Sequence, residues 1–168
     1  MDALKDNMSQ TIDRMGGEGL PDRDLVDLEQ FLLFGLEAPK NPNVASDGSL
    51  TPDQLAGKAI FESKDAACSS CHRTEQDFTD GLVHDVGTAN KAEVVRHEFD
   101  LALDPNATPP WRLNTPTLKG LFYTAPYLHD GSAKTLEEAL ERTKDTMGKT
   151  SHLNDEERRQ LIAYLMTL

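Results

Sequence analysis

The sequence predicts an all-α protein with long irregular segments between its helices. Helix-capping residues precede apolar residues at helical spacing in several places, and strand signals are poor throughout the chain. Two polar stretches, residues 73–90 and 101–114, are too long for ordinary loops. The length of 168 residues is that of one domain, or of one domain with a piece of another.

Two stretches near the N-terminus resemble two stretches near the C-terminus. Residues 4–16 match 136–148 at an offset of 132, and residues 20–32 match 153–165 at an offset of 133. Each copy reads as a helix, a loop with a Met-Gly pair, and a second helix. Amphipathic helices can resemble each other by chance, but the shared turn residues favour a repeat. We therefore expect residues 1–36 to be the helical tail of a preceding unit of the same kind.

A linker and a larger domain follow this tail. Residues 37–50 are rich in Pro, Asn, Gly and Ser, which is typical of a linker. Residues 51–168 then form the main domain. Its first helix begins after Thr51, with Pro52 at the first helical position and Gln54 completing a capping box.

Two further helices are predicted near the C-terminus. Thr135 caps one of them, and the last helix begins at Asn154. Gly57, in the first helix of the domain, leaves room for another helix to cross closely. We expect the last helix to cross there, with Phe61 packed near Tyr164.

The pentapeptide Cys68-Ser69-Ser70-Cys71-His72 has the C-x-x-C-H spacing of a c-type haem attachment site. In such a site each thiol bonds to one vinyl group of the porphyrin, and the histidine ligates the iron. The spacing keeps the three side chains within about one helical turn. The motif therefore predicts one covalent haem c, bound by Cys68, Cys71 and His72.

Two other readings of the cysteine pair have less support. Cys68 and Cys71 are the only cysteines, whereas a structural zinc site needs four ligands and would have to recruit other side chains. A thioredoxin-like pair would lie beside a βαβ pattern, and the sequence shows none.

Met147 is the predicted sixth ligand of the iron. It lies in the loop before the last helix, much as the methionine ligand does in type I cytochromes c. A thioether ligand raises the reduction potential relative to a second histidine. The alternatives are that Met147 is an exposed loop residue and that His84 or His97 takes its place. Otherwise we expect His84, His97 and His152 at the surface.

The chain is acidic, with a formal net charge of −12. Such a charge opposes binding to nucleic acid or anionic membranes, and it favours solubility or a basic redox partner. The longest apolar run, residues 31–34, is too short to span a bilayer, and residues 1–20 lack the features of a secretory leader. Bacterial haem c is attached outside the cytoplasm, so we expect a periplasmic or otherwise extracytoplasmic protein, either a mature chain or a domain of a larger one.

Several segments resemble a known family. Residues 114–120 (NTPTLKG), 124–131 (TAPYLHDG) and 135–139 (TLEEA), together with 78–81 (FTDG), are similar to the C-terminal haem domain of bacterial di-haem cytochrome c peroxidases and MauG-like proteins. The resemblance covers roughly residues 50–168. It implies a cytochrome c-like haem domain with long irregular loops, preceded by a helical remnant of another such domain.

The resemblance also implies functional details. In that family the N-terminal haem reacts with peroxide, and the C-terminal haem, ligated by methionine or, in MauG-like members, by tyrosine, passes electrons to it. Backbone oxygens matching Thr124 and Pro126 help to bind calcium in that family, so the resemblance also implies a calcium site here. His129 lies near the domain interface in relatives; the alternative is a turn histidine bonded to local backbone.

Four further side chains are candidates for the haem surroundings. Trp111 either packs on the haem edge or belongs to the core, and Arg112 either pairs with a haem propionate or lies in solvent. Tyr123 and Tyr127 are candidates for lining the pocket.

Together these residues predict electron transfer by a single haem c with His72 and Met147 as axial ligands. The partner would be a redox protein or a missing second haem domain. The alternative is a peroxidase or MauG-like oxidase acting on hydrogen peroxide, which needs a five-coordinate iron or a second haem. A third hypothesis is a docking module in which the haem is only structural.

Overall fold

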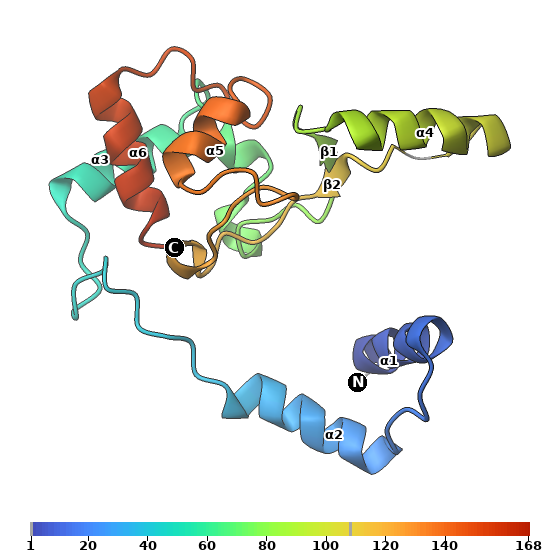
Figure 1. Cartoon of the computed structure of the whole chain (residues 1–168). Coiled ribbons are helices and arrows are strands. Elements are labelled where there is room, and N and C mark those ends of the chain that lie inside the picture. Colours follow the sequence, from blue (N-terminus) through green and yellow to red (C-terminus); the bar gives the residue numbers. More distant parts are fainter. Residues whose placement is uncertain (1, 108) are drawn as a thin grey trace. The chain divides into compact units, whose positions relative to one another are not determined.

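A computed structural model describes residues 2–107 and 109–168 of the chain (Figure 1). The chain divides into two compact units, one ending at Lys40 and the other spanning Asn41–Leu168. The C-x-x-C-H motif lies in the second unit, and so does every element that surrounds it.

The first unit is a pair of helices joined by a glycine-containing loop. Helix α1 spans Asp2–Met15 and helix α2 spans Asp22–Gln30, and α2 continues as a single π-helical turn, Phe31–Gly35. An ion pair of 2.8 Å between Lys5 Nζ and Asp22 Oδ1 links the two helices. The helix–loop–helix predicted for this stretch is confirmed, whereas its origin as the tail of a preceding domain stays a prediction.

Three helices of the second unit begin at the predicted capping residues. They are α3 (Pro52–Glu62), α5 (Leu136–Arg142) and α6 (Asp155–Leu165). Reciprocal capping boxes join Thr51 to Gln54 and Asn154 to Glu157, and the Thr135 hydroxyl accepts the Glu138 N–H in the first turn of α5. These bonds satisfy backbone donors that a helix start otherwise leaves unpaired.

Helices α3 and α6 cross at Gly57, as predicted. A Cβ atom at this position would lie 1.8 Å from the Gln160 carbonyl oxygen, so only glycine permits the approach. The rings of Phe61 and Tyr164 meet edge to face beside the crossing, with 5.5 Å between their centroids. This contact is confirmed, and both residues belong to the buried core.

The hydrophobic core of the second unit collects side chains from the three helices and the loops between them. Its buried members are Phe61, Leu118, Leu136, Leu153, Leu161, Tyr164 and Leu165. In the part of the chain that the structure describes, no helix has the length and apolar content needed to cross a membrane.

The sequence did not predict one helix and one strand pair. Helix α4 (Lys91–Leu103) begins with a capping box between Asn90 and Glu93. Strands β1 (Val83–Asp85) and β2 (Arg112–Asn114) pair antiparallel at the base of α4 (Figure 1). The pair therefore joins the two polar stretches that were expected to be wholly irregular.

Short 3-10 turns interrupt the remaining loops. They are η2 (Cys68–Ser70), η3 (Thr74–Gln76) and η4 (Leu121–Tyr123). The first of them carries the beginning of the C-x-x-C-H motif, so local helical geometry sets the spacing of the two cysteines.

Part of the expected linker is attached to the second unit. The side-chain amides of Asn41 and Asn43 both donate to the Met166 carbonyl, at 2.9 and 3.2 Å. The Gln54 side chain in turn donates to the Asn43 carbonyl at 2.8 Å. Residues 41–43 thus cover the end of α6.

Candidate functional site

A cavity of about 860 Å³ opens beside the C-x-x-C-H motif. Cofactor pockets commonly measure roughly 300–1,000 Å³, so this volume can hold a porphyrin-sized group. Cys68, Cys71, His72 and Met147 all line it. Further lining residues include Val86, Leu113, Pro116, Leu128 and Leu140. The structure therefore brings the four predicted haem-binding residues to one largely apolar space.

The two cysteines lie at the start of the cavity wall. Ala67 adopts a left-handed conformation with φ of 56°, which turns the chain into the 3-10 segment that carries Cys68. Both cysteines are half-buried and carry free thiols. Burial raises the pKa of the Cys68 thiol to about 11, so this sulfur stays protonated at neutral pH.

His72 is oriented for ligation through one ring nitrogen. The residue is 8% exposed, and its Nδ1 lies 2.9 Å from the Phe78 carbonyl oxygen. Because a carbonyl only accepts, Nδ1 carries the proton and Nε2 keeps its lone pair. Desolvation lowers the pKa of His72, which also favours the neutral ring. A ring N–H held by a backbone carbonyl is the usual arrangement of a metal-ligating histidine.

The carbonyl that holds His72 comes from a tight turn. Asp77 and Phe78 both have positive φ, at 55° and 61°. The Phe78 ring packs edge to face on Phe61, with centroids 6.1 Å apart. The Phe61 contact thus holds the turn against the core, and the Phe78 carbonyl of that turn orients the His72 imidazole.

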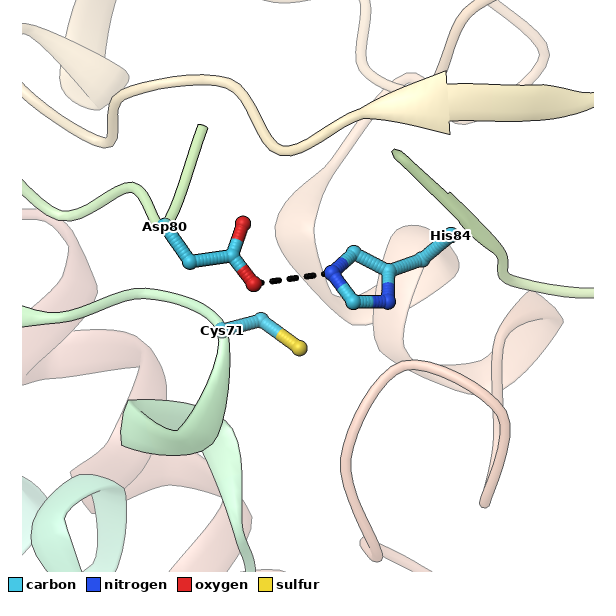
Figure 2. A group of neighbouring side chains, drawn as sticks. All are labelled: Cys71, Asp80 and His84. Atoms are coloured by element: carbon cyan, nitrogen blue, oxygen red, sulfur yellow. Dashed lines mark hydrogen bonds and ion pairs between the residues drawn. The ribbon is translucent and has the colours of Figure 1, made fainter. Parts of the chain in front are cut away.

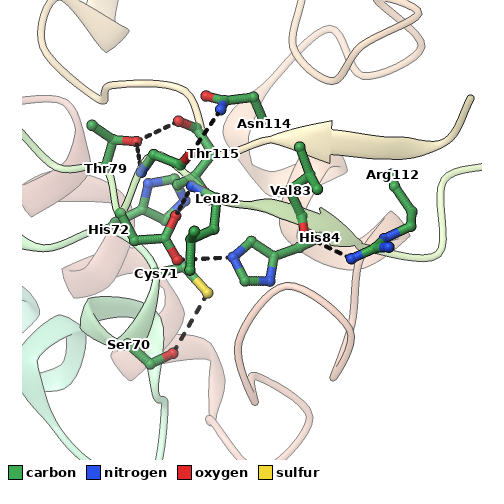
Figure 3. Close-up of polar contacts among 12 residues, drawn as sticks. Ser70, Cys71, His72, Thr79, Leu82, Val83, His84, Arg112, Asn114 and Thr115 are labelled. Atoms are coloured by element: carbon green, nitrogen blue, oxygen red, sulfur yellow. Dashed lines mark hydrogen bonds and ion pairs between the residues drawn. The ribbon is translucent and has the colours of Figure 1, made fainter. Parts of the chain in front are cut away.

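Polar bonds join this turn to the segment 114–115 (Figure 3). The Thr79 hydroxyl donates to the Thr115 carbonyl at 2.6 Å and accepts from the Gly81 N–H at 3.0 Å. The Asn114 amide donates to the Gly81 carbonyl at 3.3 Å. The family-like motifs at 78–81 and 114–120 are therefore in direct contact.

An Asp–His pair lies next to Cys71. His84 Nε2 is 2.8 Å from Asp80 Oδ2, and the Asp80 side chain is only 3% exposed. The Leu82 N–H is the main group that lowers the pKa of Asp80, to about 2, so the carboxylate is ionised at neutral pH. His84 was expected at the surface; its side chain is 36% exposed, and it also lines the cavity.

Cys71, Asp80 and His84 offer three potential metal donors within 4.8 Å of one another (Figure 2). Thiol, carboxylate and imidazole are all zinc ligands, and a three-ligand zinc site leaves a position for water. The same thiol is required for the C-x-x-C-H attachment, so the two uses of Cys71 exclude each other.

The loop of Met147 packs against the attachment segment. Gly148 has φ of 86°, and a Cβ atom there would lie 3.0 Å from the Ala66 carbonyl oxygen and 3.3 Å from Cys68 Sγ. The Lys149 N–H donates to the same Ala66 carbonyl at 2.7 Å. This close packing brings half-buried Met147 into the wall that the cysteines share.

The other histidines differ in part from expectation. His97 is buried, not exposed, because its helix α4 lays it against Trp111 with ring centroids 5.0 Å apart. His129 lines the cavity and binds side chains of α4 and its preceding loop instead of local backbone. His152 is exposed, as expected.

Of the remaining candidates for the haem surroundings, some line the cavity and others lie outside it. Tyr127 lines the cavity and donates its hydroxyl to the Leu121 carbonyl at 3.0 Å, whereas Tyr123 is 56% exposed. Trp111 is half-buried against His97, and Arg112 is exposed.

The expected calcium contacts stay a prediction. Thr124 and Pro126, whose backbone oxygens were expected to help bind calcium, both line the cavity wall.

A sequence profile described as di-haem cytochrome c peroxidase matches residues 57–165. Hydrazine synthase subunit gamma of Kuenenia stuttgartiensis is 33% identical over 172 residues, covering 84% of this chain and 48% of that protein. The methylamine utilization protein MauG of Methylorubrum extorquens is 32% identical over 155 residues, covering 86% and 42%. Cytochrome c551 peroxidase of Nitrosomonas europaea is 31% identical over 147 residues, covering 79% and 37%. The chain thus spans less than half the length of these relatives.

Two solved structures are similar in fold. A structure of Kuenenia stuttgartiensis hydrazine synthase matches with a TM-score of 0.68 and 30% identity, covering 95% of this chain and 60% of that chain. A MauG-like protein associated with microbial copper homeostasis matches with a TM-score of 0.55 and 22% identity, covering 73% and 48%.

Proposed function

Because the chain belongs to the di-haem cytochrome c peroxidase family, we propose that it binds one haem c and serves as an electron-transfer domain. Cys68 and Cys71 would form the two thioether bonds, and His72 Nε2 would ligate the iron. The observation that carries this proposal is the bond from His72 Nδ1 to the Phe78 carbonyl, which puts the proton on Nδ1 and leaves Nε2 with its lone pair, on a ring that lines the same cavity as both cysteines.

Met147 is proposed as the sixth ligand. A haem c held by His72 and Met147 would cycle between ferric and ferrous iron and so carry one electron. The protein's part is to orient the imidazole, to hold the thioether in the cavity wall and to surround the ring with apolar side chains. If both residues bound the iron, peroxide would have no open position on it.

A partner must then deliver or remove the electron. The chain spans less than half of its relatives, so a second haem domain is one source. A separate, basic redox protein is the other, since the net charge of −12 would attract it. Attachment of haem c outside the cytoplasm leads us to propose an extracytoplasmic location. The resemblance also leads us to propose calcium near Thr124 and Pro126.

Reaction with hydrogen peroxide is the second candidate function. It is favoured by the names of two relatives, a cytochrome c551 peroxidase and MauG. It requires an iron with an open position, and therefore a high-spin ferric spectrum and ready binding of cyanide.

The test compares absorption spectra and mass of the chain expressed with a working haem-maturation system. We expect the mass of the polypeptide plus one haem, and in the ferric state the weak near-infrared band of methionine ligation. Met147→Ala should abolish that band, whereas Met15→Ala, at a position 83% exposed, should keep it. A colourless chain would exclude haem binding, and an unchanged band in Met147→Ala would mean another ligand.

A further inference from the structure

His129 lines the cavity and is bound by side chains from two other segments of the chain. Its Nε2 lies 2.9 Å from Glu93 Oε1, in the first turn of α4, and its Nδ1 lies 3.2 Å from the Thr88 hydroxyl. The histidine side chain is 16% exposed and that of Glu93 is 22% exposed. These partners are 36 and 41 residues away in sequence, so His129 joins segments that the chain itself does not hold together.

The carboxylate that His129 binds is itself fixed. Glu93 Oε2 accepts the Asn90 N–H at 2.8 Å in the capping box of α4. The His129 imidazole therefore binds a carboxylate that the capping box of α4 already holds in place. His129 in turn anchors that helix start and the preceding loop to the segment 124–131.

The loop that His129 holds reaches the Met147 loop. The Thr146 hydroxyl donates to the Val86 carbonyl at 2.6 Å. A Cβ atom on Gly87 would lie 3.2 Å from the Thr146 side chain, so the two residues pack closely. Thr146 directly precedes Met147. The Met147 loop is thus held on one side by the Ala66 carbonyl and on the other by the 86–88 turn.

We propose that His129 is a positioning residue for Met147, which fixes the 86–88 turn and through Thr146 keeps the thioether in the cavity wall. The inference rests on the proposed function, because it gives Met147 the role of sixth ligand. Val86, Thr88, His129, Thr146 and Met147 all line the same cavity. Removal of the imidazole would therefore loosen the wall at the methionine and leave the cysteines and His72 in place.

The experiment measures the near-infrared band and cyanide binding of the haem-loaded full chain. His129→Ala should weaken the band and leave the haem covalently attached. If the methionine is detached in tenfold more molecules, the dissociation constant for cyanide falls about tenfold. His129→Gln, which can still donate to Glu93, should restore part of the band. His152→Ala, at an exposed histidine, should behave as the unchanged chain.

A second variant keeps the test valid if His129→Ala does not fold. Thr88→Val removes only the hydroxyl that meets His129 and keeps the side-chain shape, so it should also tighten cyanide binding. If both variants keep the band and the cyanide affinity while Met147→Ala loses the band, His129 has no positioning role and the proposed function stands. If Met147→Ala itself keeps the band, the proposed ligand is wrong.

Discussion

Asp80 places a negative charge beside Cys71 of the C-x-x-C-H motif. The Leu82 N–H, and to a smaller extent His84 and Thr115, lower the pKa of its carboxyl to about 2. A carboxyl whose pKa is lower in the folded state stabilises the protein above its unfolded pKa of about 3.9. That stabilisation disappears as the pH falls through about 2.

We expect Asp80→Asn to lower the melting temperature at pH 6, and the difference from the unchanged chain to shrink between pH 4 and pH 2. Thermal unfolding followed by circular dichroism across this range measures it. Asp27→Asn is the control, because that carboxyl is exposed on α2 of the first unit. A difference that stays constant down to pH 2 would mean that the charge of Asp80 contributes nothing to stability.

Gly148 meets two separate demands, a positive φ and a close contact with the attachment segment. Gly148→Ala should cost about 1–2 kcal/mol from the left-handed backbone alone. It should also push the loop away from Cys68 and weaken methionine ligation. Gly16→Ala is the matched control, because Gly16 has φ of 73° but no atom within 4 Å of the added Cβ. The near-infrared band should fall only in Gly148→Ala; equal spectra in both variants would contradict the contact argument.

The site residues that the sequence could predict are those defined by local spacing. Cys68, Cys71 and His72 form one short motif, and their chemistry can be read without knowing the fold. His129 could not be assigned in this way, because its partners lie 36 and 41 residues away. His97 was misplaced for a similar reason, since it is buried against Trp111 from a separate segment.

At the scale of elements, the crossing of α3 and α6 organises the second unit. A Cβ atom on Gly57 would collide with the Gln160 carbonyl and force the helices apart. Overpacking of a core typically costs about 1–3 kcal/mol, and alanine regains about 1 kcal/mol through its helix propensity. We expect Gly57→Ala to lower the melting temperature by several degrees, whereas Leu55→Ala, at a position 54% exposed on α3, should change it little. A rise in melting temperature with Gly57→Ala would show that the crossing adapts.

Helices that combine a capping signal with one apolar stripe could be predicted from the sequence. Helix α4 could not, because it has only the first of these two signals. Its capping box is present in the sequence at Asn90 and Glu93, but its apolar residues do not form a buried stripe. Val95, Phe99 and Leu103 are 56%, 64% and 74% exposed. Strands β1 and β2 were missed because three residues are too few to show an alternating pattern.

At the scale of the whole molecule, the repeat and the C-x-x-C-H motif predicted a small helical unit before a larger haem-binding one. The structure divides the chain after Lys40, ten residues before the start assigned to the main domain from composition. The two boundaries differ because Asn41 and Asn43, which lie among turn residues in the sequence, bind the end of α6 through their side chains. The residue composition of this stretch predicts an irregular backbone, but it does not reveal that the stretch binds a helix far away in the sequence.

This boundary leads to a prediction about independent folding. A chain of residues 41–168 should keep the haem spectrum and the melting temperature of the full chain, because it includes the residues that line the cavity and the asparagines that bind the end of α6. A chain of residues 51–168 loses the three hydrogen bonds that Asn41 and Asn43 make with Met166 and Gln54. At about 1 kcal/mol for each bond, its melting temperature should fall by several degrees.

Calorimetry of the two haem-loaded chains measures these melting temperatures. Equal melting temperatures would show that the asparagines do not belong to the folded unit, and a loss of stability already at 41–168 would show that the first forty residues do.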